Sequence, residues 1–403
     1  MRLIPGDRRV LVPVYLYTMG TWASYALVIV VLPFRFQDLG LSVVEYGVAL
    51  AVYAFGTLAT EGLWGYLAFR MGSVRWLGSL AVVTAVSLFA LGFTGSFPLL
   101  VALLGIYGAL VVYSTPLMRW IGMTASGPGT ASRGIGLLGL FFGAGMTAGT
   151  AVGPVLYSLG GFRLNLYAGT ALLLLSTIPL LLVRWDTVSL PRGRPRADRS
   201  LRALLERRFA LATALVVLFF MVLTLETSFL QYYSIDLFGG TVVEAGYVIG
   251  AGRAVALVSG VVLGGFVDRW GHSRAAPLGF LLLAVGAVGT WCSGSYEEMV
   301  AATLVLACGV GWLSVSLLPM ALSSILPEHQ GTAVGVFGSF EDLGLILGPL
   351  VFGLVYANLG PRDLFPVAAA LALLGGILAL SAKARWRTQG SPVARPAPPL
   401  GQT

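Results

Sequence analysis

Charged residues, histidine and cysteine are all scarce in this chain of 403 residues. Only 10% of the residues are charged, 57% are hydrophobic, and the mean hydropathy is +0.88. A chain of this composition has more apolar surface than the cores of soluble domains can bury. We therefore expect it to lie in a lipid bilayer, and the composition excludes an ordinary soluble protein.

The few residues that commonly bind metals or cofactors do not cluster in the sequence. Cys292 and Cys308 lie in apolar runs, which leaves no disulfide framework and no cysteine-based metal site. His272 and His329 fall in expected turns without acids or cysteines at ligand spacing. The glycine-rich run at 136–145 follows no strand, so it is not expected to bind a nucleotide. We predict no cofactor, no metal and no enzymatic activity.

Apolar segments follow one another along almost the whole chain. A membrane-spanning helix needs roughly 20 mostly apolar residues, and twelve segments meet that requirement. They cover residues 11–33, 43–64, 76–94, 97–120, 132–159, 164–183, 209–236, 242–263, 276–293, 298–325, 332–357 and 364–382. The sequence therefore predicts an all-α membrane protein with twelve transmembrane helices.

The distribution of basic residues predicts the orientation in the membrane. If the N-terminus is inside, 21 of the 25 basic residues fall in cytoplasmic segments, and only Arg35, Arg163 and Arg362 lie outside. We therefore expect a multi-pass protein of the inner (cytoplasmic) membrane with both termini in the cytoplasm. Because this asymmetry accounts for the net charge of +8, nucleic-acid binding is not expected.

One stretch of sequence occurs twice, at residues 40–75 and 239–274. Each copy ends in a glycine-flanked, basic pattern, which indicates that one structural unit is used twice. We predict a six-helix bundle over 1–185, a basic cytoplasmic linker over 186–208, a second six-helix bundle over 209–385, and a disordered cytoplasmic tail over 386–403. The patterned positions are Gly65, Arg70, Gly72 and Arg75, and then Gly264, Asp268, Arg269, Gly271 and Arg274.

Small residues at every fourth position mark the fifth and eleventh expected spans. They predict close helix packing and, because each series ends in a proline, a bend. A hinge between moving halves and rigid packing are both compatible with this pattern. The residues concerned are Gly149, Gly153, Pro154, Gly344, Gly348 and Pro349.

Together these patterns resemble the major facilitator superfamily of twelve-span secondary transporters. The resemblance covers about residues 10–385. It implies two six-helix halves, alternating access, and a cytoplasmic gate formed by the glycine-flanked turns; the Gly-Pro pattern of the fifth span is associated with exporters in that family. Two positions depart from the family: Phe69 replaces an aspartate in the first turn, and Val101 replaces an arginine that proton-coupled drug exporters usually carry.

Four ionisable residues fall within expected spans of the second half. Each costs at least a few kcal/mol in a membrane, so each is a candidate coupling group. They are Glu226, Arg253, Glu341 and Asp342. Glu226 is expected either to bind a proton or cationic solute or to pair with Arg253. Glu61, just before the first gate turn, is expected to pair with Arg70, Arg75 or Arg119.

Polar and aromatic side chains of several spans are candidates for substrate binding. Aromatic walls with few polar groups suit flat, apolar or cationic solutes, although packing between helices explains any one of them equally well. The candidates are Thr18, Trp22, Tyr25, Tyr113, Glu226, Tyr233, Trp312 and Ser316.

The sequence favours a monomeric secondary transporter that exports small amphipathic or hydrophobic compounds in exchange for protons. The expected partners are a small-molecule substrate, protons and the lipid bilayer. The first alternative is an importer or facilitator of a nutrient such as a sugar or organic acid. The second is a receptor or scaffold that transports nothing, which the cost of intramembrane charges argues against.

Overall fold

The computed structural model describes residues 7–71, 75–118, 121, 131–183, 207–323, 325 and 330–388, and every regular element in these ranges is helical. The first half contains α1 (Arg8–Ile29), α2 (Leu32–Asp38), α3 (Val43–Met71), α4 (Arg75–Ala90), η1 (Leu91–Phe93), α5 (Phe97–Val111) and α7 (Ala131–Leu181). The second half contains α9 (Arg207–Thr224), η3 (Leu225–Phe229), α10 (Leu230–Phe238), α11 (Val242–Trp270), α12 (His272–Cys292), α13 (Tyr296–Leu322), α14 (Gln330–Leu359), η5 (Pro361–Asp363) and α15 (Leu364–Thr388). Most of the expected linker and most of the expected tail lie outside the described residues, and the last two linker residues, Arg207 and Arg208, begin α9.

Eleven segments of the described chain are long and apolar enough to cross a membrane. One of them, Gly136–Leu181, has 46 residues, which as one helix would measure about 69 Å against about 30 Å of hydrocarbon. Gly160 and Gly161 interrupt this helix, and Gly161 has a φ of 65°, which favours glycine. Dividing the segment there gives twelve spans, so the predicted all-α membrane fold is confirmed.

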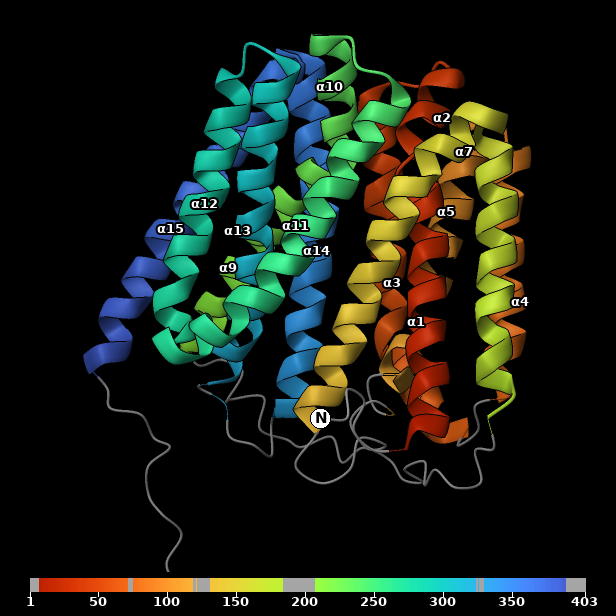
Figure 1. The fold of residues 1–403 in the computed structure, drawn as a ribbon, viewed down its shortest axis with the longest axis horizontal. Helices are drawn as coiled ribbons and strands as arrows, with labels where there is room; N and C mark the ends of the chain where they lie inside the picture. The colour runs from red at the N-terminus through yellow and green to blue at the C-terminus, as the bar shows by residue number, and fades with distance from the viewer. Residues whose placement is uncertain are drawn as a thin grey trace, which may run out of the picture.

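The helices of the two halves lie on opposite sides of the bundle. Figure 1 shows the first half in red to yellow and the second half in green to blue, with α3, α7, α11 and α14 near the boundary. We call the end at which α1 begins and α15 ends the proximal end, and the opposite end the distal end.

The repeated stretch begins with a helix cap in both copies. The side chain of Glu45 accepts hydrogen bonds from the backbone and hydroxyl of Ser42 (2.7 and 2.8 Å), and Glu244 accepts the same pair from Thr241 (both 2.8 Å). In return, each hydroxyl accepts from the glutamate backbone. These capping boxes satisfy amide groups that the first turns of α3 and α11 leave without helical partners.

The small-residue series bring helices of one half together. A methyl group on Gly149 would overlap the carbonyl oxygen of Ala23 in α1. A methyl group on Gly344 would overlap the side chain of Phe220 in α9 in the same way. Close helix packing therefore depends on glycine at these positions.

Candidate functional site

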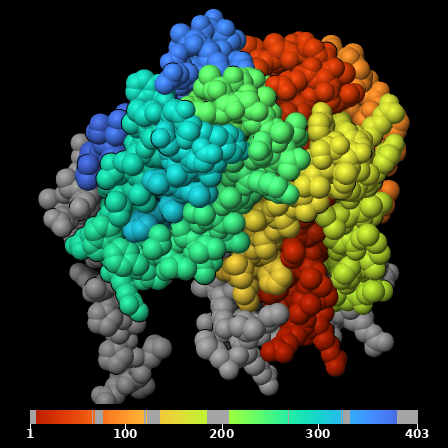
Figure 2. Space-filling view, turned by 45° about the horizontal axis from the view of Figure 1, so that its top comes forward, coloured from red at the N-terminus to blue at the C-terminus, as the bar shows by residue number. Residues whose placement is uncertain are grey.

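The two halves are in direct backbone contact near the distal end. A methyl group on Gly47 of α3 would overlap the carbonyl oxygen of Pro349 in α14, and one on Gly246 of α11 would overlap the ring of Pro154 in α7. The two prolines therefore lie against glycines of the opposite half. Figure 2, which turns the distal end toward the viewer, shows red and orange atoms of the first half against green and blue atoms of the second.

Polar and aromatic side chains extend this distal contact. Gln231 donates its amide to the carbonyl oxygen of Val30 at 3.3 Å, and the Tyr232 hydroxyl donates to that of Pro33 at 3.1 Å. The Tyr46 ring lies 5.7 Å, centroid to centroid, from the rings of both Phe229 and Tyr232. Each of these contacts joins the first half to the second, so they form a closing layer between the halves.

Glu226 lies on the proximal side of this layer, in a turn of unusual geometry. Residues Leu225–Phe229 form a π-helical turn between α9 and α10, a feature that is frequent at functional sites. The Glu226 side chain is 2% exposed, and both carboxyl oxygens are buried without a hydrogen-bond partner. Its Oε1 atom lies against Gly252, where an added methyl group would come within 2.7 Å.

Arg253 follows Gly252 in α11. Its side chain is partly exposed, and its Nε atom is buried without an acceptor. The titratable groups within electrostatic range of it are Glu226 in its own half and the neutral Tyr25 in α1. Within the described chain, Glu226 and Arg253 are neighbours but do not form an ion pair.

Aromatic side chains of the first half continue from Tyr25. The Trp22 ring lies 5.5 Å from Tyr25 and 4.6 Å from Phe142 of α7, in edge-to-face contacts. The Tyr25 ring stacks on Tyr53 of α3 at 5.8 Å, and Tyr53 lies 6.1 Å from Tyr107 of α5. Trp22 and Tyr25 are partly exposed, and Tyr25 lies within electrostatic range of Arg253, so part of this aromatic wall is accessible near that arginine.

The other candidate binding residues make contacts within their own halves. The side chains of Thr18 and Ser316 each donate a hydrogen bond to a carbonyl oxygen of their own helix. Tyr113 accepts a hydrogen bond from Tyr17, Tyr233 donates to the carbonyl oxygen of Thr290, and Trp312 donates to that of Ala275. All five side chains are therefore engaged within their own halves, and their roles in binding stay predictions.

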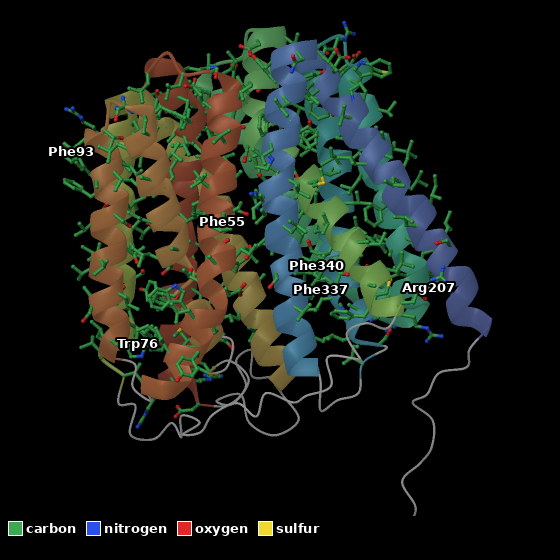
Figure 3. The ribbon with its side chains drawn as sticks, turned by 180° about the vertical axis from the view of Figure 1, so that it is seen from behind. Phe55, Trp76, Phe93, Arg207, Phe337 and Phe340 are labelled. Carbon is green, nitrogen blue, oxygen red and sulfur yellow. The ribbon has the colours of Figure 1, made fainter. Side chains whose placement is uncertain are left out.

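The acids of α14 lie at the boundary between the halves. Glu341 and Asp342 are both partly exposed, and Asp342 acts electrostatically on Tyr53 of the first half. Figure 3 places Phe337 and Phe340 on α14 and Phe55 on α3, at neighbouring helices of the two halves. Asp342 is therefore a second charged group beside the aromatic wall.

The predicted gate is described only in part. In the second copy, Arg269 and Arg274 are exposed, and Gly271 ends α11 with a φ of 92°, a conformation that favours glycine. Gly264 has no neighbour that a methyl group would meet.

The first copy of the gate is described less fully. Gly65 lies within α3. The described part does not include Gly72, Arg119, or the side chains of Arg70, Arg75 and, in the second copy, Asp268. Glu61 lies near Gly338 of α14, and its predicted arginine pairing stays a prediction.

Sequence reasoning missed the closing layer and two matched pairs near it. Tyr157 donates to the carboxylate of Asp38, and Tyr356 donates to that of Asp236. The tyrosines are 199 residues apart, as are the two copies of the repeated stretch. That spacing was visible in the sequence and could have predicted equivalent pairs in the two halves.

Comparison with known proteins settles the family. The profile described as Major Facilitator Superfamily matches residues 14–315 and 255–401. The chain belongs to the major facilitator superfamily. The resemblance found in the sequence is thus confirmed, and the chain belongs to a family of membrane transporters rather than enzymes.

The relatives carry different descriptions. The chain is 25% identical over 378 residues to "Multidrug resistance protein MdtG" of Proteus mirabilis, with 87% of this chain and 90% of that protein covered. It is 31% identical over 189 residues to "Putative tartrate transporter" of Agrobacterium vitis, covering 45% and 37%. A Salmonella typhimurium protein described as an uncharacterized MFS-type transporter is 32% identical over 27% of this chain and 28% of that protein.

A solved structure shares the fold at lower identity. The inward-facing, occupied structure of a bacterial homolog of the human lysosomal transporter Spinster is 16% identical, with a TM-score of 0.80 over 95% of this chain and 98% of that one. This likeness extends over almost the whole bundle.

Proposed function

We propose that this protein is a proton-coupled secondary transporter that moves a small amphipathic solute by alternating access. The proposed site lies between the halves, with Glu226 as the proton-binding group and Trp22, Tyr25 and Arg253 as the groups that face the solute. We further propose that the protein works as a monomer in an inner membrane with both termini in the cytoplasm, as its basic residues predict.

The observation that carries this proposal is the environment of Glu226. A carboxylate that is buried in a membrane without a hydrogen bond or ion pair is costly. We infer that Glu226 holds a proton in this arrangement, in which the distal ends of the halves touch. A rearrangement that brings the carboxyl group to water or to Arg253 would stabilise the charged form and release that proton. The titratable groups around Glu226 while it takes up and releases the proton are Arg253 and, within electrostatic range of Arg253, Tyr25.

The solute is inferred from the aromatic wall. Rings that are partly exposed offer a surface for an apolar or aromatic solute body, and a few polar groups fix its orientation. The wall belongs to the first half and Arg253 to the second, so one solute can contact both halves. Such a contact gives the solute different interactions in the two arrangements of the halves, as alternating access requires.

Two directions of coupling are candidates, and each rests on one observation. Co-transport of proton and solute is favoured by the proximity of Glu226 to Arg253, because a proton on Glu226 leaves Arg253 free for a solute group. Export in exchange for protons is favoured by the relative named as a multidrug resistance protein, which the chain matches along most of its length.

The test is solute flux in proteoliposomes with a pH gradient of either sign. The probes are naphthalenesulfonate and naphthylmethyl-trimethylammonium, which keep their charge at all pH values used. The gradient should accelerate wild-type flux in one direction and slow it in the other, and the sign separates co-transport from exchange. Glu226→Gln should keep solute exchange but lose the response to the gradient.

Glu297→Gln is the matched control, because this glutamate is exposed at the beginning of α13. It should respond to the gradient as the wild type does. A gradient response of Glu226→Gln equal to that of Glu297→Gln would reject Glu226 as the coupling group. Wild-type flux that ignores the gradient would reject proton coupling itself.

A further inference from the structure

We propose that the solute is an organic anion, whose charged group binds Arg253 and whose apolar body lies on Trp22 and Tyr25. This inference rests on the proposed transport function and names the substrate class of the same site. The anionic group is a carboxylate, phosphate or sulfonate, since these share the acceptor geometry that a guanidinium group recognises.

The first argument is that Arg253 lacks a partner for its charge. An arginine side chain stays protonated in proteins and donates up to five hydrogen bonds. Its Nε atom is buried without an acceptor, and it forms no ion pair with Glu226 in the part of the chain described. A buried donor without an acceptor is costly, and a bound anion would remove that cost.

The second argument is the position of the charges relative to a solute. Arg253 is partly exposed, and so are Tyr25, which lies within its electrostatic range, and Trp22, whose ring contacts that of Tyr25. Glu226, in contrast, is 2% exposed and lies behind Gly252. A solute at the aromatic wall therefore meets the positive charge of Arg253 before the carboxyl group of Glu226.

The same positions argue against a lipophilic cation, one of the solute types that the aromatic side chains suited in the sequence. A cation on the aromatic wall would be repelled by Arg253, and Glu226 is too buried to receive it. Asp342 is the acid that such a cation would use, because it is partly exposed and acts on Tyr53 in the same wall. Binding of a cation is therefore the outcome that opposes the proposal.

The test is equilibrium dialysis of the full-length protein in lipid nanodiscs, without any gradient, against three probes of the same shape. These are naphthalenesulfonate, the neutral naphthalenesulfonamide and the cationic naphthylmethyl-trimethylammonium; empty nanodiscs correct for partition into lipid. We expect the wild type to bind the sulfonate about tenfold or more tightly than the sulfonamide. Arg253→Gln should weaken sulfonate binding to the sulfonamide level while leaving the sulfonamide unchanged.

Two further variants separate a binding role from a structural one. Arg253→Lys should recover part of the preference for the sulfonate, because it restores the charge without the planar donor pair. Arg163→Gln removes an exposed arginine of α7 and should bind all three probes as the wild type does.

Several outcomes would overturn the proposal. They are equal wild-type affinity for the three probes, tighter binding of the cation, no measurable binding of the sulfonate, and an Arg253→Gln variant that weakens all probes alike. Because no pH gradient enters this experiment, its failure is distinguishable from a failure of proton coupling. Sulfonate binding that depends on Arg253, combined with flux that ignores pH, would keep the anion site and reject coupling.

Discussion

Replacing Gly246 by alanine should open the distal contact between the halves. The added methyl group would overlap the Pro154 ring of the opposite half, although alanine by itself favours the helical backbone of α11. Overpacking of a close contact costs about 1–3 kcal/mol. If the halves separate to relieve it, the balance between closed and open distal ends shifts by about 5-fold to 150-fold.

The measurement is the distance between spin labels at the distal ends of the two halves. Arg163 and Arg362 are exposed there, one in each half, and each is replaced by cysteine to carry a spin label. The native Cys292 and Cys308 are replaced as well, so that no other cysteine is labelled. Gly246→Ala should increase the fraction of long distances. Gly95→Ala is the control, because a methyl group there meets no neighbour within 4 Å.

An unchanged distance distribution in Gly246→Ala would refute the reasoning. If the thermal midpoint also fell, the clash would have been absorbed inside one half, and Pro154 would not be part of a closing contact. Gly47→Ala tests the opposite side of the bundle in the same way, since its methyl group would meet the Pro349 carbonyl. Both variants should shift the distances in the same direction if the distal end closes as one unit.

Three further predictions follow from single contacts. Gly252→Ala should impair gradient-driven flux more than solute binding, because its methyl group displaces the Glu226 carboxyl; equal loss of both would contradict a specific effect on the proton site. Tyr232→Phe removes the hydroxyl that donates to Pro33 and should increase the long spin-label distances less than Gly246→Ala does; no change would mean that the ring alone closes the layer. Thr241→Ala removes a helix cap and should lower the thermal midpoint without altering the distances, as differential scanning fluorimetry and the same labels would show.

The fold could be predicted because the bilayer imposes a strict requirement. Spanning segments must be apolar, helical and long enough to cross, so hydropathy alone places them. The predicted boundary between the fifth and sixth spans falls at residues 159–164, and the break in α7 at Gly160 and Gly161 falls within it. A glycine pair there was readable as the end of one helix and the beginning of the next.

The site was less predictable because helix rotation decides which residues meet. Four of the candidates from the sequence are linked in the structure: Trp22 contacts Tyr25, and Arg253 lies within electrostatic range of both Tyr25 and Glu226. Tyr113, Tyr233 and Trp312 have the same residue types but bond within their own halves. Residue type and span number do not fix the face of a helix, and twelve helices leave many faces with similar composition.

The role of the span-five and span-eleven prolines shows how one motif serves two contacts. The glycines before each proline pack α7 on α1 and α14 on α9, within one half. The prolines themselves meet Gly246 and Gly47 of the opposite half. A substitution at Gly149 should therefore lower the stability of the first half, whereas one at Gly246 should change the relation between the halves. The sequence left hinge and packing as alternatives for this motif, and the structure places packing on its glycines and the contact between halves on its prolines.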